Sequence, residues 1–365
     1  MKILVHAARE LAHPYAGGSE VYMDQVLKGL HELGHEVHLA TSAPVGVRPY
    51  ETSANGGTFS QFFRAPLWLL TKRRRYDVVI DVANGMTFYS PLFRRRPTVC
   101  LVHHIHTKMW GEWFPAPVAA FGRFLERRMM PLVYRRSTFV AVSESTSVEL
   151  QRLGVKADNI RIVHNSTAVP PQPVCAKDST PLFVACGRLV PHKQFHLLLE
   201  HWPKIRAATN GRLVIIGEGP ERARLEALLT DGASLAGRVA ESERNRLFAR
   251  ATALLHPSYV EGWGLVIMEA AAQETAAIGF DVPGVRDSIV DGETGWVCHD
   301  IDHLVKQWLA IAADAKGRAA MSSAARERAH EFGAGRLVYS FAAVLDEVTA
   351  PAQSMTVDSV PTILK

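Results

Sequence analysis

The sequence predicts an α/β protein made of two doubly wound parallel sheets, each covered by helices on both faces. Short runs of β-branched residues alternate with longer amphipathic stretches throughout the 365 residues, a pattern typical of parallel strands joined by crossover helices. A chain of this length suits two domains better than one core. Residues Thr167–Pro181, rich in proline and polar side chains, divide it nearly in half, as an interdomain linker would.

The first half contains six short runs rich in valine, leucine or isoleucine, which favour buried strands. These expected strands are Lys2–His6, Glu36–Thr41, Val78–Asp81, Thr98–Val102, Phe139–Val142 and Arg161–His164. Between them apolar residues recur at helical spacing. The expected helices are Ser19–Leu33, Val118–Tyr134 and Glu144–Leu153.

The second half repeats the alternation, with strands expected at Leu182–Ala185, Arg212–Ile216, Ala253–His256, Thr275–Phe280 and Trp296–Cys298. Its expected helices are Leu197–Ala208, Glu221–Leu229, Glu241–Ala249, Gly264–Gln273, His303–Ala313 and Gly317–Phe332, followed by Leu337–Thr349. We therefore expect domains at 1–168 and 169–335, and a helix within 336–350 that packs back toward the N-terminal domain. Residues 351–365 lack helical periodicity and are expected to be loose.

Composition indicates an ordinary globular protein, with 47% hydrophobic and 21% charged residues. No apolar run is long enough to span a bilayer, and the opening MKILVHAARE resembles a first strand rather than a signal peptide. The four cysteines lack C-x-x-C spacing. Reduced thiols, and hence a cytoplasmic enzyme, are the expectation.

Positive charge is concentrated in the first half of the chain. Residues 1–168 hold 21 Lys and Arg against 13 Asp and Glu, whereas the remainder holds 20 against 23. A basic domain suggests an anionic acceptor or the inner face of an anionic membrane. Nucleic acid is disfavoured, because no nucleic-acid-binding motif accompanies the basic clusters.

The segment Met109–Arg136 combines tryptophans and phenylalanines with five arginines. It could form a patch at a membrane interface. More often such a helix buries its apolar face in the domain and exposes its arginines. The sequence leaves both alternatives open.

The most informative stretch is Tyr259–Gln273, YVEGWGLVIMEAAAQ. Glu261 and Glu269 are eight residues apart across a glycine-rich turn and an expected helix, so one carboxylate lies at the helix start and the other about two turns deeper. The N–H groups of Gly262, Trp263 and Gly264 at the positive end of the helix form an anion site. An acid, a diphosphate cradle and a second acid together indicate a nucleotide-sugar site.

Two cations follow the first strand of the second half, in GRLVPHK. Arg188 and Lys193 could pair with a diphosphate and hold its charge as the bond to a sugar breaks. Near the N-terminus, Gly17 and Gly18 precede a helix, where backbone amides favour phosphate. Ser19 could instead be a simple N-cap. The G-x-G-x-x-G spacing of dinucleotide-binding enzymes is absent.

Three histidines, His103, His104 and His106, follow an expected strand. No carboxylate or cysteine set completes a zinc site nearby, so a hydrogen bond to a sugar hydroxyl is preferred to a metal site. Asp300 and Asp302 match the D-x-D of metal-dependent sugar transferases, but they precede a helix, where an acid serves as N-cap. We expect neither a metal nor another cofactor.

Taken in order, these motifs resemble retaining glycosyltransferases of family 4, which have the GT-B fold of two Rossmann-like domains facing a central cleft. The resemblance covers nearly the whole chain, including VAVSEST (140–146) and VPGVRDSIVDGETGWV (282–297). It implies an N-terminal domain that binds the acceptor and a C-terminal domain that binds the nucleotide-sugar.

The resemblance also implies roles for individual residues. Catalytic roles fall on His103, Arg188, Lys193 and Glu261. Donor-binding roles fall on Gly17, Gly18, Arg188, Lys193, Val239, Glu261, Gly262, Trp263, Gly264, Leu265 and Glu269. In the family pattern Glu261 contacts the transferred sugar and Glu269 the ribose. Backbone at Val239 reads the base, and His103 lies by the sugar with His104 as the alternative.

The chain departs from the family pattern in two places. Trp263 stands where phenylalanine is common, and its bulk is expected to narrow the donor or acceptor pocket. His164-Asn165-Ser166 stands where Asn-Gly is frequent, which is expected to stiffen the hinge.

The expected activity is retaining transfer of a hexose-type sugar from a UDP- or GDP-sugar to a hydroxyl. The acceptor could be a polysaccharide, a lipid-linked saccharide or a natural-product precursor. The alternatives are a disaccharide phosphorylase or synthase of the same fold, a sugar epimerase, and a non-catalytic subunit that binds sugar or nucleotide.

Overall fold

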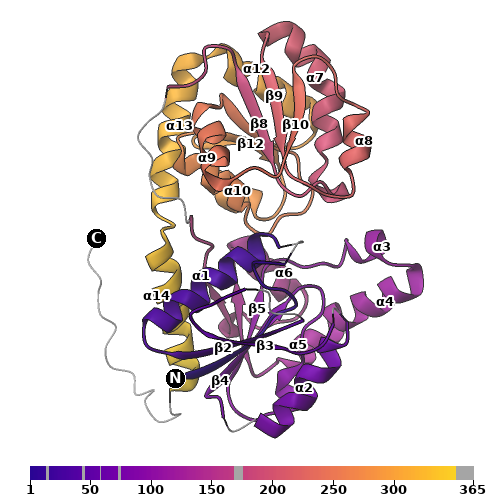
Figure 1. Cartoon of the computed structure of the whole chain (residues 1–365), viewed down its shortest axis with the longest axis vertical. Coiled ribbons are helices and arrows are strands. Elements are labelled where there is room, and N and C mark those ends of the chain that lie inside the picture. Colours follow the sequence, from indigo (N-terminus) through magenta and orange to yellow (C-terminus); the bar gives the residue numbers. More distant parts are fainter. Residues whose placement is uncertain (14–15, 43–45, 58, 73–74, 168–175, 351–365) are drawn as a thin grey trace.

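The computed structural model describes residues 1–13, 16–42, 46–57, 59–72, 75–167 and 176–350. It contains two α/β domains, one above the other in Figure 1, and each holds an all-parallel sheet. The predicted fold class is confirmed. Most of the expected linker and the whole expected loose tail lie outside the described residues.

The N-terminal domain has a seven-stranded sheet in the order β3-β2-β1-β4-β5-β6-β7. Its strands are β1 Lys2–His6, β2 Glu36–Thr41, β3 Glu51–Ala54, β4 Val78–Ala83, β5 Thr98–Val102, β6 Thr138–Ala141 and β7 Ile160–Ile162. The order reverses between β1 and β4, the topological switch point of a doubly wound sheet. Its main helices are α1 Gly18–Glu32, α2 Gln61–Lys72, α3 Trp110–Trp113, α4 Ala116–Phe124, α5 Met130–Val133 and α6 Glu144–Arg152.

The C-terminal domain has a six-stranded sheet in the order β10-β9-β8-β11-β12-β13. Its strands are β8 Leu182–Cys186, β9 Arg212–Ile216, β10 Ala233–Gly237, β11 Ala253–His256, β12 Ala277–Phe280 and β13 Gly295–Cys298. Its helices are α7 Phe195–Thr209, α8 Arg222–Glu226, α9 Glu241–Arg250, α10 Leu265–Ala272, α11 Val285–Ser288, α12 Ile301–Ala313 and α13 Ala315–His330. The last helix, α14 Ala334–Thr349, continues down to the N-terminal domain (Figure 1).

The sequence missed the strands β3 and β10 and the helices α2, α3 and α11, of which the last two have only four residues each. The strands β3 and β10 have no fully apolar run, because both lie at sheet edges and keep exposed positions. The helix α2 contains Pro66, which argues against a helix when only the sequence is read. The single helix expected over residues 118–134 is interrupted by a π-helical turn, Leu125–Met129, between α4 and α5.

The central strands are buried on both faces, which explains their continuous apolar runs. The helix α14 belongs to the N-terminal core, since its Leu337, Phe341 and Leu345 lie in the same buried cluster as Val26 and Leu27 of α1. The two chain crossings between the domains run together, because the Thr167 N–H donates to the Phe332 carbonyl at 2.8 Å.

The carboxyl ends of both sheets carry the segments that meet between the domains. His103 follows β5 in the first sheet, and Gly187 and Arg188 follow β8 in the second. A Cβ added to Gly262 would lie 2.3 Å from the His103 carbonyl oxygen, so the two domains touch closely here. Ligands of doubly wound folds bind at this edge. No helix in the described part of the chain is both long and apolar enough to cross a bilayer.

Candidate active site

Glu261 lies at the centre of a charged cluster in the C-terminal domain. The Lys193 ammonium Nζ donates to its Oε2 at 2.6 Å, and His256 Nε2 lies 3.0 Å from the same oxygen. Lys193 comes from the 3₁₀ turn Pro191–Lys193 after β8, and His256 is the last residue of β11. Adjacent strands therefore present the cation and the histidine to one carboxylate.

The protonation states in this cluster follow from the same contacts. Burial alone would raise the pKa of Glu261, but the Lys193 charge and the hydrogen bond with His256 hold it well below its usual value. Burial, and then Lys193, lower the pKa of His256. At neutral pH the pair is thus a carboxylate and a neutral imidazole that donates Nε2–H to it.

His256 belongs to no motif that is visible in the sequence. The one sequence feature that could have indicated a role for His256 is its position at the end of a strand, at the edge where parallel sheets bind ligands. Two other polar neighbours were also missed, His192 beside Lys193 and Arg244 beside Glu269. Neither belongs to a motif that sequence alone can read.

Arg188 is a partly buried cation beside the charged cluster. Burial lowers the pKa of its guanidinium, as does Arg9, while Glu20 and Glu261 act in the opposite direction. Its guanidinium makes no ion pair or hydrogen bond with any residue that the structure describes. A buried guanidinium costs free energy unless something binds it, so Arg188 is available for an anionic ligand.

The N-termini of α1 and α10 meet beside Arg188. Gly18 is the first residue of α1, and its added Cβ would lie 2.8 Å from Leu265, the first residue of α10. At Gly17, an added Cβ would lie 3.8 Å from Arg188 Nε. The positive ends of two helix dipoles thus converge with a cation, which is favourable for a phosphate group.

Both N-caps are glycines. Gly17 caps α1, and its N–H donates to the Glu20 carboxylate at 2.7 Å. The alternative of Ser19 as N-cap is therefore wrong; its hydroxyl donates to Glu20 instead. Gly264 caps α10 with φ of +80°, a left-handed conformation that side chains rarely adopt.

Glu269 lies on α10, while Glu261 precedes the helix in the loop, as their spacing predicts. Arg244 of α9 pairs with Glu269 at 3.1 Å. Burial raises the pKa of Glu269, and Arg244 acts against that rise. The residue Val239 follows β10 at the same edge, three strands along from β11. A nucleotide could therefore extend from Glu261 toward the edge of the sheet.

Of the histidines after β5, His104 rather than His103 faces the charged cluster. His103 is buried edge-on against Tyr22, with ring centroids 5.1 Å apart. The ring of His104 stacks on His106 and senses the charges of Glu261 and Arg188. Burial lowers the pKa of His104 to about 4 despite the nearby Glu261, so it is a neutral hydrogen-bonding group. In the described part of the chain, no three His, Cys, Asp or Glu side chains are grouped to hold a metal ion.

The expectation that Trp263 narrows a ligand pocket stays a prediction, and its side chain is buried at the interdomain crossing. The side chain is buried against Phe332 and His164, with ring centroids 4.9 and 5.0 Å away. The two departures from the family pattern therefore contact each other beside the interdomain crossing. Asp300 caps α12 by accepting from the His303 N–H at 2.7 Å, which confirms its predicted capping role.

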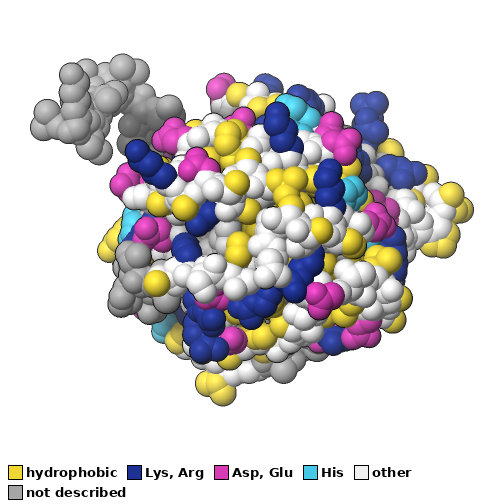
Figure 2. Space-filling view, turned by 90° about the horizontal axis from the view of Figure 1, so that it is seen from above, with side chains coloured by type: hydrophobic (Ala, Val, Ile, Leu, Met, Phe, Trp, Pro, Cys, Tyr) yellow, Lys and Arg dark blue, Asp and Glu magenta, His cyan; other side chains and the backbone are white. Residues whose placement is uncertain are grey.

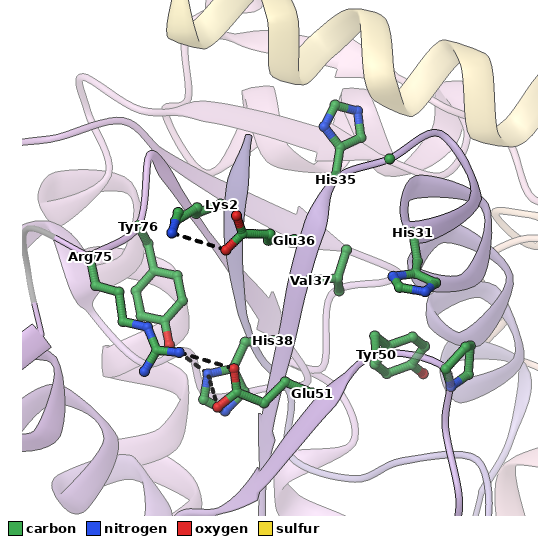
Figure 3. A pocket seen from close by; sticks show the side chains of 12 residues that line it. Lys2, His31, His35, Glu36, Val37, His38, Tyr50, Glu51, Arg75 and Tyr76 are labelled. Atoms are coloured by element: carbon green, nitrogen blue, oxygen red, sulfur yellow. Dashed lines mark hydrogen bonds and ion pairs between the residues drawn. The ribbon is translucent and has the colours of Figure 1, made fainter.

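The cavity drawn in Figure 3 lies at the other end of the N-terminal sheet. It has a volume of about 390 Å³ and opens at the amino ends of β1, β2 and β3. Its charges are paired with one another, Lys2 with Glu36 and Arg75 with Glu51. The His38 ring is satisfied by Tyr76 and Ser53. The cavity also lies at the edge of the sheet opposite to the one where such folds bind ligands, so the cluster around Glu261 is the candidate site.

Comparison with known proteins assigns a family to each half of the chain. Residues 16–168 match the model for glycosyltransferase family 4, and residues 172–328 match the model for glycosyl transferases group 1. The sulfoquinovosyl transferase of Arabidopsis thaliana is 23% identical over 87% of this chain and 68% of its own length. A D-inositol 3-phosphate glycosyltransferase of Kribbella flavida is 26% identical, over 87% of this chain and 88% of its own length.

A solved structure shows the same fold. Anabaena HepE, crystallised with UDP and glucose, superimposes with a TM-score of 0.75 at 17% identity. The match covers 95% of this chain and 100% of the HepE chain. At this identity the likeness establishes the GT-B arrangement of two domains.

Proposed function

Because this chain belongs to glycosyltransferase family 4, we propose that it transfers a hexose-type sugar with retention of anomeric configuration. The donor is a UDP- or GDP-sugar. The acceptor is a hydroxyl of a polysaccharide, a lipid-linked saccharide or a natural-product precursor. The guanidinium of Arg188 carries this proposal, because it lies where two helix N-termini converge and has no hydrogen-bonding partner among the described residues.

In this proposal each group at the site has one task. Arg188, Lys193 and the amides that begin α1 and α10 hold the diphosphate as it leaves. Glu261 leaves its pairing with Lys193 to accept hydrogen bonds from the sugar hydroxyls, and His256 keeps it oriented. Glu269 binds the ribose, and His104 or His103 lies beside the sugar from the other domain.

The positive charge that the leaving group needs is supplied by protein groups, so we propose that the reaction needs no metal. The acceptor hydroxyl attacks on the face that the diphosphate leaves and passes its proton to a departing phosphate oxygen. Closure of the domains excludes water. We propose a cytoplasmic location, because the three described cysteines are free thiols, which suit a reducing compartment.

The test is release of nucleoside diphosphate from a panel of UDP- and GDP-sugars, with and without candidate acceptors. Lys193→Ala is expected to lower kcat about a hundredfold, because it removes one cation from the leaving group. Lys204→Ala is the matched control, since Lys204 is exposed on α7 of the same domain. Equal turnover by Lys193→Ala and wild type would remove Lys193 from this role.

The panel also separates the alternatives. Turnover only with inorganic phosphate or a sugar phosphate as acceptor would indicate the phosphorylase or synthase. Binding without any release would indicate the non-catalytic subunit. Product anomeric configuration, read by NMR against that of the donor, tests retention, and unchanged turnover in EDTA tests independence of metal.

A further inference from the structure

We propose that α2 and the segment from α3 to α5 form one docking surface for an anionic lipid bilayer. We call it the apolar surface and define it by nine exposed side chains: Phe59, Phe63, Leu67, Leu70, Trp113, Val118, Phe121, Phe124 and Leu132. Soluble proteins rarely expose so many large apolar side chains together. The inference concerns binding to lipid, and it stands or falls independently of the transferase activity.

The α4 helix is held with its phenylalanines outward. Phe121 is 61% exposed and Phe124 is also exposed, whereas Gly122 and the carboxylate of Glu126 face inward. Glu126 accepts hydrogen bonds from the His106 N–H at 2.6 Å and the Thr107 hydroxyl at 2.8 Å. An acidic residue buried beneath exposed phenylalanines reverses the usual pattern of a surface helix.

The register of α4 is also fixed by packing. A Cβ at Gly122 would lie 2.3 Å from the ring of Trp110, so no other residue fits there without movement. Rotating the helix to bury Phe121 would break this contact and the bonds to Glu126. The outward apolar face is therefore built into the fold.

The α2 helix also exposes large apolar side chains and buries a polar one. Phe63, Leu67 and Leu70 follow one face at spacings of four and three residues, and the first two are 72% and 61% exposed. On the opposite face Gln61 is almost fully buried, with its amide donating to the Ala8 carbonyl. A polar side chain again holds the helix so that its large apolar residues face water.

The helices α2 and α4 lie next to each other. Phe59, just before α2, contacts Phe114, just before α4, with ring centroids 6.5 Å apart. Figure 1 shows α2, α3 and α4 on the same side of the N-terminal domain. In Figure 2 hydrophobic side chains gather at the right-hand edge, the side where Figure 1 places α3 and α4.

The charged residues around the apolar surface indicate what kind of partner binds there. Arg64, Arg127 and Arg128 are exposed beside it. The two acids from α3 to α5 are Glu126, which is buried, and Glu112, which accepts a hydrogen bond from Tyr259. Apolar side chains with a rim of arginines match a bilayer that has anionic headgroups. A second copy of this chain would instead bring like charges together.

The apolar surface lies next to the candidate active site. The Glu112 carboxylate of α3 accepts a hydrogen bond from the Tyr259 hydroxyl, two residues before Glu261. A bilayer bound to α2 and α4 would therefore lie close to α3, which contacts the loop that carries Glu261. The helices would lie within the headgroup region, since none of the described helices can span the membrane.

The test is co-flotation with vesicles of phosphatidylcholine containing about one third phosphatidylglycerol, without donor or acceptor. Phe63→Ser combined with Phe121→Ser is expected to weaken the partition coefficient about tenfold or more, because each removes a phenyl ring from the interface. Tyr339→Ser is the matched control, since Tyr339 is 67% exposed on α14, away from the apolar surface. Thermal unfolding of every variant should match wild type, because the altered side chains are exposed.

A second set of variants tests the contribution of the arginines to vesicle binding. Arg127→Gln combined with Arg128→Gln is expected to weaken binding several-fold and to reduce its salt dependence, whereas Arg246→Gln on α9 should not. Failure of the wild-type chain to float with these vesicles would overturn the proposal. So would equal binding by the phenylalanine variant, or a dimer in sedimentation that this variant dissociates.

Discussion

At the scale of single residues, Glu126 is a buried acid that serves a loop rather than a substrate. It lies on the π-helical turn and accepts hydrogen bonds from the backbone of His106 and the hydroxyl of Thr107. That loop also carries His104 to the candidate active site. Such turns are frequent where a helix must place a functional group, but the sequence shows only an acid among arginines.

Glu126 should give the stability of the protein a distinct pH dependence. Burial raises its pKa from 4.5 to about 7, against the hydrogen bonds from His106 and Thr107. The native state therefore holds a proton between these values that the unfolded state has lost, so the free energy of unfolding falls as the pH rises from 4.5 to about 7. The Glu126→Gln variant has no carboxyl group to titrate, so it should not show this fall in the free energy of unfolding. The fall is at most about 3 kcal/mol.

Urea unfolding of wild type and Glu126→Gln at about pH 5 and about pH 8 measures the effect. The free energy of unfolding of wild type, relative to that of the variant, should be lower at the higher pH than at the lower pH. An equal pH dependence in both proteins would show that Glu126 titrates as an ordinary exposed acid.

At the scale of elements, sequence patterns locate strands better than they locate helix faces. Buried strands such as β4 and β5 are apolar at every position, so they stand out in any window. The helix α2 was missed, and no pattern shows that α4 turns its phenylalanines to water. The direction of a helical face depends on what packs beneath it, here Trp110 against Gly122.

The start of α12 offers a test of a motif that sequence can misread. Asp300→Ala should lower the free energy of unfolding by about 1 kcal/mol, because the His303 N–H loses its capping acceptor. Asp300→Asn should retain most of that stability, and turnover should be unchanged in both variants. Loss of turnover in Asp300→Asn would instead support a D-x-D metal site.

At the scale of the whole molecule, the candidate active site draws its residues from both domains. Arg188 and Glu261 come from one sheet, while Gly17, Gly18 and His104 come from the other. Thr167 and Phe332 join the two chain crossings. The candidate site is therefore complete only while the two domains are closed on each other.

Gly262→Ala should prevent that closure. Its Cβ would lie 2.3 Å from the carbonyl oxygen of His103 in the opposite domain, and backbone cannot yield as a flexible side chain can. We expect kcat/KM to fall about a hundredfold, as misplacement of catalytic groups by about 1 Å does. The radius of gyration in small-angle scattering should increase.

Gly335→Ala is the control, because no atom lies within 4 Å of the Cβ it adds. It should keep wild-type turnover and dimensions. A Gly262→Ala variant with normal turnover would mean that transfer does not require the contact between Gly262 and His103.

The sequence alone determined the fold class and the family, and it supplied most of the residues proposed for the candidate site. Strand burial, glycine caps and the spacing of Glu261 from Glu269 are local properties, which short stretches of chain encode. Only the tertiary structure showed that His256 supports Glu261, that His104 faces the charges in place of His103, and that Trp263 lies beside the hinge. It also turned the apolar faces of α2 and α4 outward. These features depend on contacts between residues far apart in the chain, and the direction in which a side chain points is set by the packing around it.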